Sequence, residues 1–375
     1  MNFAEHVAKA EFAAAGIAVP IGRLAATPAE ALAAAQALGP VAVKAQVPAG
    51  KRGKAGAIAL ADTPVEAETA ARRILGMTLG AHKVERVLVE ERVAIARELY
   101  AAVLSDPASK GPLVLFSTLG GMDIEEAAAR DAGAVRRRPV DIVAGFTARD
   151  ADAMLGSLDL GPARGKVVEL LVLLYAFWRS RDAELVEINP LALTASGDLV
   201  ALDGKFAVVD GALPRQETLA KLGVPEPLSA LEARGRALGL RFIELDGNVG
   251  ILANGAGLTM TTMDAVRHFG GRPANFLEIG GEAYTQAKPA LELVLANPGV
   301  KSLVVNFCGA FARTDVMADG VVKAWEELRP KIPVFFSIHG TGEEEAVKLV
   351  KDRLGITPYE SMDDAVKNAV EAARA

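Results

Sequence analysis

Three oxygen-bearing side chains in the middle of the chain have the types and the spacing of a magnesium site. Glu187 and Asn189 stand two residues apart in "LVEINPLAL", so a strand would place both on one face. Asp203 follows in "LDGKF", on a second apolar stretch joined to the first by a turn at 195–198. Oxygen ligands without His or Cys suit Mg²⁺ bound together with substrate phosphates. A polar hairpin face in water would contain the same residues, so both interpretations stay open.

A basic, glycine-broken stretch near the N-terminus could bind a polyphosphate. In "VKAQVPAGKRGKAG" (43–56), Lys44 lies on an apolar strand and is followed by a loop that contains Lys51, Arg52 and Gly53. Backbone amides and cations in a flexible loop are what a triphosphate requires. A solvated basic turn has the same composition and is the commoner explanation, so this stretch alone does not decide.

Two stretches in the second half could meet an anionic ligand. "NGAGLTMTTMD" begins at Asn254 and Gly255 and predicts the start of a helix after a strand. Free backbone N–H groups at such a helix start attract anions. An ordinary tight turn would have the same sequence pattern. In "LVVNFCGAFARTD" we expect Gly309 to break a buried strand and Cys308 to be a buried packing residue. Phe311 then follows just past the strand, where parallel sheets bind their ligands.

The elements that must position these residues predict an α/β protein in two parts. From Phe242 onward, apolar strands, Gly-rich turns and helices alternate, which is typical of a doubly wound parallel sheet. The first part mixes helices, short strands and the hairpin around residue 197. A polar, helical connector separates the two patterns, and the predicted domains are 1–230 and 231–375.

Composition limits the function classes. The chain has 375 residues, of which 51% are hydrophobic and 23% charged, with a formal net charge of -6. This acidic balance argues against a nucleic-acid partner, which needs a basic surface. The sequence contains no run of about 18 apolar residues, which is the length that would predict a membrane span. A single cysteine fits a reducing, cytoplasmic location.

Taken in order along the chain, the motifs resemble the β subunit of the ADP-forming succinyl-CoA synthetase (succinate–CoA ligase) family. The resemblance extends from "EHVAKAEFAAAGIAVPIG" through "VAVKAQVPAGKRGKAG", "VLVEERVAIARELY" and "GGMDIEEAAA" to "LVEINPLALTASGDLVALDGKF". It continues through "LDGNVGILANGAGLTMTTMD", "GGRPANFLEIGG" and "VNFCGAFARTD". It implies an ATP-grasp domain that binds nucleotide and Mg²⁺ in the first part, and a flavodoxin-like CoA-ligase domain in the second.

The resemblance also implies roles for individual residues. The nucleotide positions are Lys44, Arg52, Gly53, Glu90 and Glu98, with Pro20 as the variant that accompanies adenine. The Mg²⁺ ligands are Asn189 and Asp203, and Glu187 is the carboxylate that steadies a phosphohistidine. The substrate positions are Asn254, Gly255, Gly309, Ala310, Phe311 and Ala312.

A partner and a reaction follow from the same resemblance. An α subunit would carry the phosphohistidine and the main CoA-binding domain, and would form a heterodimer or heterotetramer with this chain. An acid attacks a phosphoryl group to give an acyl phosphate, CoA displaces the phosphate, and ATP regenerates the phosphohistidine. In phosphoryl transfer the protein mainly positions groups and offsets charge, so the expected cofactors are ATP and Mg²⁺, with CoA as co-substrate.

The chain departs from the family pattern mainly on the acid side. Ala310 and Phe311 replace Gly and Ile, Glu282 replaces Gly, and Ser337 and His339 replace Arg and Glu, while Pro48 and Lys51 alter the basic loop. An aromatic ring and a new charge near a carboxylate suggest an acid other than succinate, either another dicarboxylate or a sulfonated acid. The alternatives are a malate–CoA ligase or citrate-cleavage subunit, a stand-alone ATP-grasp carboxylate–amine ligase, and a non-catalytic regulatory paralogue.

Overall fold

A computed structural model describes residues 1–48, 50, 52–122, 124–131, 133–225, 227–279 and 286–374. Lys51 and Glu282, two of the departures from the family pattern, lie outside these residues. The chain divides into two compact units, Met1–Pro227 and Leu228–Ala375. They are called the N-terminal and C-terminal units below, and each is described by itself.

The N-terminal unit is built on two antiparallel sheets. One has the strand order β1-β6-β2-β3, and the other has the order β11-β10-β7-β8-β9 with β12 also paired to β10. A separate two-stranded hairpin joins β4 to β5. The strands are β1 (Gly22–Ala25), β2 (Val41–Ala45), β3 (Ile58–Ala61), β4 (Thr78–Leu79), β5 (His82–Lys83), β6 (Val87–Glu91), β7 (Arg97–Asp106), β8 (Gly111–Ser117), β9 (Val135–Pro139), β10 (Ala183–Leu193), β11 (Leu199–Ala201) and β12 (Gly204–Val208).

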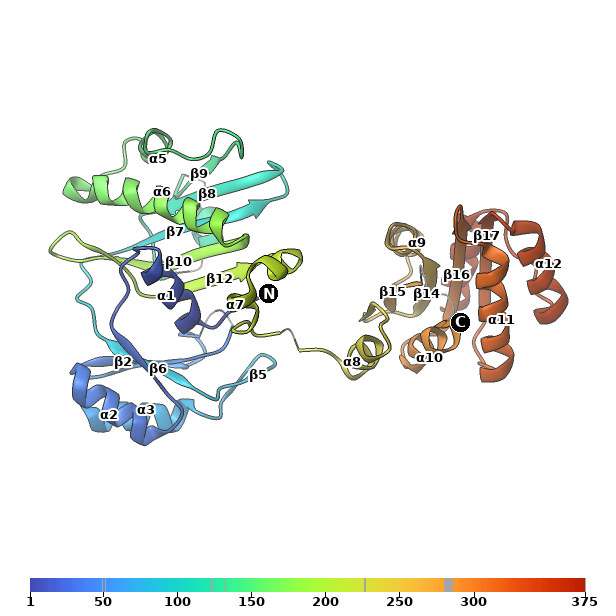
Figure 1. The fold of residues 1–375 in the computed structure, drawn as a ribbon, viewed down its shortest axis with the longest axis horizontal. Helices are drawn as coiled ribbons and strands as arrows, with labels where there is room; N and C mark the ends of the chain where they lie inside the picture. The colour runs from blue at the N-terminus through green and yellow to red at the C-terminus, as the bar shows by residue number, and fades with distance from the viewer. Residues whose placement is uncertain are drawn as a thin grey trace. The chain divides into compact units, whose positions relative to one another are not determined.

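Helices cover each of these sheets (Figure 1). α2 and α3 pack on the first sheet through small alanines, and the side chains of Thr27 and Thr63 cap their N-termini. α1, α5 and α6 pack on the second sheet around Phe12, Leu171 and Phe206. The helices are α1 (Glu5–Ala14), α2 (Pro28–Leu38), α3 (Pro64–Ile74), α4 (Ile124–Arg130), α5 (Ala148–Leu155), α6 (Arg164–Ser180) and α7 (Glu217–Ala220), with the 3₁₀ turns η1 (Gly161–Ala163) and η2 (Asp210–Arg215).

The C-terminal unit confirms the expected doubly wound sheet. Its strand order is β13-β15-β14-β16-β17, parallel throughout except that the edge strand β13 runs antiparallel to β15. α10, α11 and α12 pack on one face, and α9 and α13 pack on the other. The elements are α8 (Ala230–Ala237), β13 (Phe242–Glu244), β14 (Val249–Asn254), α9 (Ala256–His268), β15 (Asn275–Ile279), α10 (Ala287–Ala296), β16 (Ser302–Gly309), α11 (Thr314–Leu328), β17 (Val334–Gly340), α12 (Glu343–Leu354) and α13 (Met362–Ala372).

The end of β16 differs from the sequence prediction. Gly309 does not break the strand but is its last residue, and it pairs with Gly340 at the end of β17. Cys308 is exposed and not buried, although the six residues before it on β16 are all buried. The paired glycines let the two strand ends approach closely, since a Cβ on Gly340 would lie 2.0 Å from the Gly309 carbonyl oxygen.

Gly340→Ala should therefore destabilise the C-terminal unit by about 2–4 kcal/mol, from a positive φ combined with a backbone clash. The control is Gly355→Ala, because Gly355 has a similar φ of +68° but no atom within 4 Å of the added Cβ. Left-handed backbone alone should cost that variant about 1 kcal/mol. Urea unfolding of both variants measures the difference, and equal losses would contradict the close-approach explanation.

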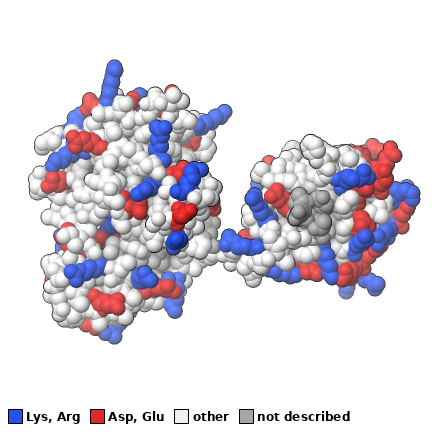
Figure 2. Space-filling view, in the orientation of Figure 1, with Lys and Arg blue, Asp and Glu red and all other residues white. Residues whose placement is uncertain are grey.

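The surface agrees with the acidic, mixed-charge composition. The face of the N-terminal unit in Figure 2 carries Lys and Arg among Asp and Glu in small groups, with no broad area of one sign. In the described part of the chain, no helix is both long enough and apolar enough to cross a bilayer.

Candidate active site

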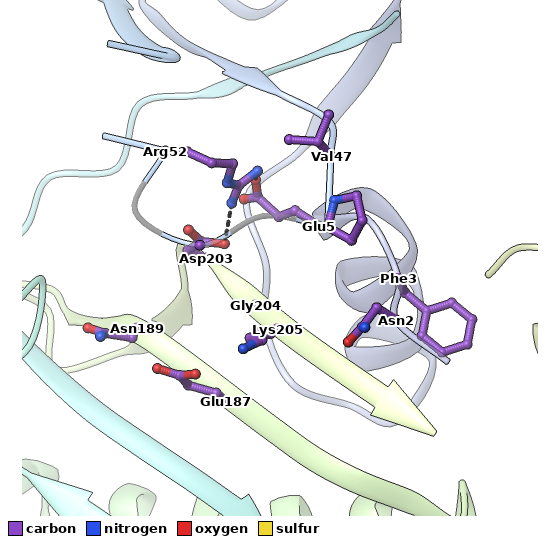
Figure 3. Close-up of a pocket in the computed structure, with 12 residues that line it drawn as sticks. Asn2, Phe3, Glu5, Val47, Arg52, Glu187, Asn189, Asp203, Gly204 and Lys205 are labelled. Atoms are coloured by element: carbon purple, nitrogen blue, oxygen red, sulfur yellow. Dashed lines mark hydrogen bonds and ion pairs between the residues drawn. The ribbon is translucent and has the colours of Figure 1, made fainter. Parts of the chain in front are cut away.

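The three oxygen-bearing residues come together at the β10–β12 hairpin. Asn189 lies where the register between β10 and β7 shifts, so the strand bulges there and leaves its regular ladder. The backbone N–H of Asn189 donates to the Asp203 carbonyl oxygen at 3.3 Å. Glu187 pairs across the sheet with Lys205 of β12. The hairpin thus places two carboxylates, one carboxamide and one ammonium group close together, as Figure 3 shows.

The Asn189 side chain also holds a neighbouring loop. Its Oδ1 accepts a hydrogen bond from the Gly121 N–H at 2.8 Å, and its Nδ2 donates to the Met122 carbonyl at 3.0 Å. Glu98 lies against the same loop, because a Cβ on Gly121 would fall 2.0 Å from its Oε2. A carbonyl oxygen has two lone pairs, so Oδ1 keeps one for a further ligand.

The residues of the hairpin fit a magnesium ion bound with substrate phosphates. Asn189 Oδ1 and the Asp203 carboxylate are hard oxygen donors, and Mg²⁺ usually takes one or two protein carboxylates and keeps several waters. Among the described residues, no group of three or more His, Cys, Asp or Glu side chains could hold a metal by itself. The donor set is therefore too small for an all-protein metal cage and suits a metal that shares its ligands with a substrate.

Arg52 connects the basic loop to this hairpin. Its Nη2 lies 2.6 Å from Asp203 Oδ1, and its Nη1 donates to the Ala45 carbonyl at 2.8 Å. Lys44 extends from β2 into the same region, and its Nζ donates to the Leu202 carbonyl at 2.5 Å. Both cations are buried, with 6% exposure for Arg52 and 7% for Lys44. The loop cations and the candidate metal ligands thus form one connected cluster, which the sequence did not establish.

Two residues that we did not select from the sequence complete the cluster. Glu5 and Lys9 of α1 are 2% and 4% exposed, and their side chains form an ion pair at 2.8 Å. Lys9 also contacts Glu90 of β6, which in turn contacts Lys44. The helical spacing Glu5, Ala8, Lys9, Phe12 could have indicated this, because it places a charged pair on the helix face that packs inward.

The charges in this cluster shift one another's pKa values. Burial alone would raise the pKa of Glu5, but Lys44, Lys9 and Arg52 outweigh it and hold that pKa far below its usual range. Burial opposes the charge of Lys44, yet Glu5 and Glu90 raise its pKa. Burial and the charge of Glu5 raise the pKa of Asp203, against the opposing effects of Arg52 and Lys44. The pairing therefore favours the charged forms of Glu5 and Lys44 against the effect of burial.

A cleft between the two sheets of the N-terminal unit gives access to these groups. A cavity of about 980 Å³ and an adjoining one of about 150 Å³ share their central lining. The shared residues are Asn2, Gly50, Arg52, Glu187, Asn189, Asp203 and Lys205. Gly53 also lines the larger cavity, together with Tyr100, whose hydroxyl has its pKa raised by burial and by the charge of Glu187.

The other expected nucleotide residues lie beside the cleft. Lys44, Glu90, Glu98 and Pro20 are not among the described residues that line either cavity. Pro20 is buried just before β1, whose residue Gly22 pairs with Glu90. Lys44 and Glu90 support the cleft through the ion pairs around Glu5.

The expected substrate residues of the C-terminal unit meet at the switch point of its sheet. Asn254 ends β14, and its side chain accepts from the Cys308 N–H at 2.8 Å and donates to the Cys308 carbonyl at 2.9 Å. Gly255, with φ of +80°, is the N-cap residue of α9, and no side chain caps the first N–H groups of that helix. β14 and β16 are the strands from which the chain turns in opposite directions, where doubly wound sheets bind ligands.

The loop from Gly309 to Ala312 leaves Phe311 without packing contacts. The Phe311 side chain is fully exposed, at 105% of its reference area, and Ala310 is exposed beside it. Thr341 anchors the loop by donating to the Ala310 carbonyl at 2.9 Å. Nearby, His339 lies 3.5 Å from Glu343. Phe311 is therefore not a core residue of this unit.

Comparison with known proteins identifies the class to which the two units belong. Residues 2–193 match the family described as an ATP-grasp domain, and residues 252–370 match the family described as CoA-ligase. The expected fold class, an ATP-grasp part followed by a flavodoxin-like CoA-ligase part, is confirmed.

Curated relatives narrow the class further. The chain is 42% identical to the "Succinate--CoA ligase [ADP-forming] subunit beta" of Rubrobacter xylanophilus, over 100% of this chain and 99% of the relative. It is 43% identical to the "Succinate--CoA ligase [GDP-forming] subunit beta" of Thermus thermophilus, over 94% of each chain. The chain therefore belongs to the family of succinate–CoA ligase β subunits, as its motifs predicted, and is a subunit of an acid–thiol ligase. A β subunit implies an α-subunit partner.

A solved structure gives the same fold at lower identity. The ATP citrate lyase from Methanothrix soehngenii, in complex with citrate and coenzyme A, superposes with a TM-score of 0.68. The likeness covers 99% of each chain at 24% sequence identity, so it supports the fold and not the substrate.

Proposed function

We propose that this chain is the β subunit of an ADP-forming acid–CoA ligase. With an α subunit that carries a phosphohistidine, it couples hydrolysis of ATP to ADP and phosphate with thioester formation between CoA and a small carboxylic acid. The pair works in the cytoplasm as a heterodimer or a heterotetramer. The observation that carries the proposal is the meeting of Arg52, Glu187, Asn189 and Asp203 in one cleft between the two sheets.

The nucleotide polyphosphate binds at the basic loop. Arg52 Nη2 and the backbone around Gly53 face the cleft and donate to phosphate oxygens. The ammonium of Lys44 contacts Glu5, Glu90 and the Leu202 carbonyl, so all three of its donors are engaged. Lys44 acts on the phosphates through its charge or after exchanging one of these partners. Glu90, Glu98 and Pro20 shape the adjoining nucleotide pocket, and Pro20 favours adenine over guanine.

Asn189 and Asp203 hold the magnesium ion, which neutralises phosphate charge when it is bound. Glu187 lies on β10, as Asn189 does, and has a different role. A carboxylate there accepts the N–H of one imidazole nitrogen and so fixes the tautomer and orientation of a histidine whose other nitrogen meets the phosphoryl group. In the C-terminal unit, Asn254, Gly255 and the start of α9 provide N–H donors for the anionic phosphohistidine and substrate.

The acid is one other than succinate. Its binding loop, Gly309 to Ala312, presents an exposed phenylalanine where the family has a smaller aliphatic residue. An aromatic face reduces the volume open to the acid, and His339, which pairs with Cys308 near the ends of β16 and β17, provides a hydrogen-bond donor or a cation. A different short dicarboxylate or a sulfonated acid fits these changes.

The variant Ala310→Gly/Phe311→Ile should shift the acid preference toward succinate, since it restores volume and removes the aromatic face. We expect the ratio of kcat/KM for succinate to that for the best acid to rise about 10-fold, equivalent to a little over 1 kcal/mol. Met260→Ala is a suitable control, because Met260 is another exposed apolar side chain of the same unit. An unchanged ratio in the loop variant would show that the loop does not select the acid.

The proposal is tested with the chain purified together with its α subunit. Labelled ATP should phosphorylate a histidine of the α subunit, and addition of acid and CoA should discharge it with formation of a CoA ester. ATP should give a higher kcat/KM than GTP. An acid panel with succinate, malate, citrate and sulfonated acids identifies the substrate. Carboxylate–amine ligation by this chain alone would overturn the proposal in favour of a stand-alone ligase.

A further inference from the structure

The buried charged face of α1 has a composition that packing alone does not explain. Ala8 and Phe12 are fully buried on this helix, and Glu5 and Lys9 are buried beside them. Removing a carboxylate and an ammonium from water carries a large desolvation cost, and well-packed apolar residues often stabilise such a position more. A helix that serves only packing has no need of this pair, so the reason for the pair lies in the groups that it contacts.

The Glu5 carboxylate connects the two cations to which we assign the polyphosphate. Its Oε1 lies 3.3 Å from Lys44 Nζ, and its Oε2 lies 2.7 Å from Arg52 Nη1. Lys9 and Gln46 flank it, with Lys9 Nζ at 2.8 Å from Oε1 and Gln46 Nε2 at 3.5 Å from Oε2. Lys44 belongs to β2 and Arg52 to the loop that follows β2, so this one carboxylate fixes two separate elements.

The contacts of Arg52 divide the guanidinium into a fixed side and an exchangeable side. Nη1 contacts Glu5 and the Ala45 carbonyl, neither of which is a group that a ligand replaces. Nη2 contacts Asp203, which lies in the cleft with its side chain 29% exposed. Glu5 therefore holds Arg52 by one nitrogen and leaves the other directed toward the cleft, as Figure 3 shows.

We propose that Glu5 is a positioning residue of the nucleotide site, which fixes Lys44 and Arg52 in the arrangement that receives the polyphosphate. This inference rests on the proposed nucleotide role of the cleft. Glu5 lines the smaller cavity with only 2% of its surface exposed, and its role is to hold the two cations in place. Lys9 offsets the buried charge of Glu5 and of Glu90, so that the cluster of Glu5, Lys9, Lys44, Arg52, Glu90 and Asp203 has three carboxylates and three cations.

Glu5→Gln tests the role in the complex with the α subunit, with ADP and Mg²⁺ as the binding probe. The amide keeps the size of the side chain but loses the charge that aligns the two cations. We expect the Kd for ADP and the KM for ATP to rise about 10-fold or more, as is usual when the support of a binding group is removed. The values of KM for CoA and for the acid should not change, and Glu5→Asp should recover part of the ADP affinity.

A matched control lies on the same helix. Glu11→Gln makes the same chemical change and breaks an ion pair with Arg181 at 2.8 Å, but Glu11 has no contact with the cluster. It should leave the Kd for ADP within about 2-fold of the wild type. If Glu5→Gln and Glu11→Gln gave the same Kd, Glu5 would be a structural residue and the inference would be wrong.

Two further variants separate positioning from folding. Glu5→Gln/Lys9→Gln removes one charge of each sign and keeps the cluster neutral, so it remains testable if Glu5→Gln alone fails to fold. It should still weaken ADP binding about 10-fold, and wild-type affinity would overturn the inference. In an Arg52→Ala background, Glu5→Gln should add much less than it does alone, because coupled residues are not additive. If the wild-type complex itself bound no ADP, the proposed function would fail instead.

Discussion

Asp203→Asn in the α–β complex lowers kcat/KM for ATP by about 100-fold or more and raises the Mg²⁺ concentration needed for half-maximal activity. The substitution removes the negative charge of the carboxylate that we assign as a metal ligand. It also gives Arg52 Nη2, which lies 2.6 Å from Asp203 Oδ1 in the wild type, a neutral partner. The carboxamide retains one oxygen donor, so binding of the metal is weakened and not abolished. Initial rates measured over a grid of ATP and Mg²⁺ concentrations separate the two effects.

The control for this prediction is Asp198→Asn in the turn of the same hairpin. Asp198 is exposed and forms an ion pair with Lys166 at 2.8 Å, away from the cleft. We expect its kcat/KM to stay within about 2-fold of the wild type, as is usual for surface substitutions. A loss of activity in Asp203→Asn that excess Mg²⁺ does not alter, with an unchanged half-saturating Mg²⁺ concentration, would contradict its assignment as a metal ligand.

Glu187→Gln should separate the two halves of the reaction. Without a carboxylate to orient the imidazole, phosphorylation of the α-subunit histidine by ATP should slow by about 100-fold, within the range expected for loss of an orienting or proton-transfer group. Transfer from a phosphorylated α subunit to acid and CoA should keep its rate, because we assign that step to Asn254, Gly255 and the start of α9 in the C-terminal unit. The Kd for ADP should also be unchanged. Rapid-quench measurement of each half-reaction tests the split.

Glu184→Gln serves as its control. Glu184 lies three residues earlier on β10, is exposed, and lines the same large cavity. Its loss should affect neither half-reaction by more than about 2-fold. If Glu187→Gln slowed both half-reactions equally, the residue would support the fold of the subunit and would not orient the histidine.

The sequence could predict the parts of the molecule in which side-chain type follows a regular period. The hairpin around residue 197 has two apolar strands and a Gly-containing turn, so this local pattern was enough to group Glu187, Asn189 and Asp203. The strand–turn–helix rhythm after Phe242 identified the doubly wound sheet for the same reason. The place of Asn254 between a strand and a helix followed from this rhythm, but the switch point did not, because it depends on the order of the strands in the sheet.

Other features depend on long-range contacts that no local pattern contains. β9 reads "VRRRP" and does not look like a strand, yet it pairs with β8 because a charged strand is tolerated at the edge of a sheet. The burial of Glu5 depends on Lys44 and Arg52, which are 39 and 47 residues further along the chain. Cys308 is exposed although the residues before it on β16 are buried, and its apolar neighbours in the sequence do not reveal this change.

The exposure of Cys308 also makes the chain convenient for spectroscopy. It is the only cysteine in the sequence, and the Asn254 carboxamide forms hydrogen bonds with both its backbone N–H and its backbone carbonyl. A maleimide dye or a spin label would therefore attach to the natural chain at one defined point, three residues from Phe311. No cysteine would have to be introduced or removed, and the attached probe would report directly on events at the switch point of the sheet.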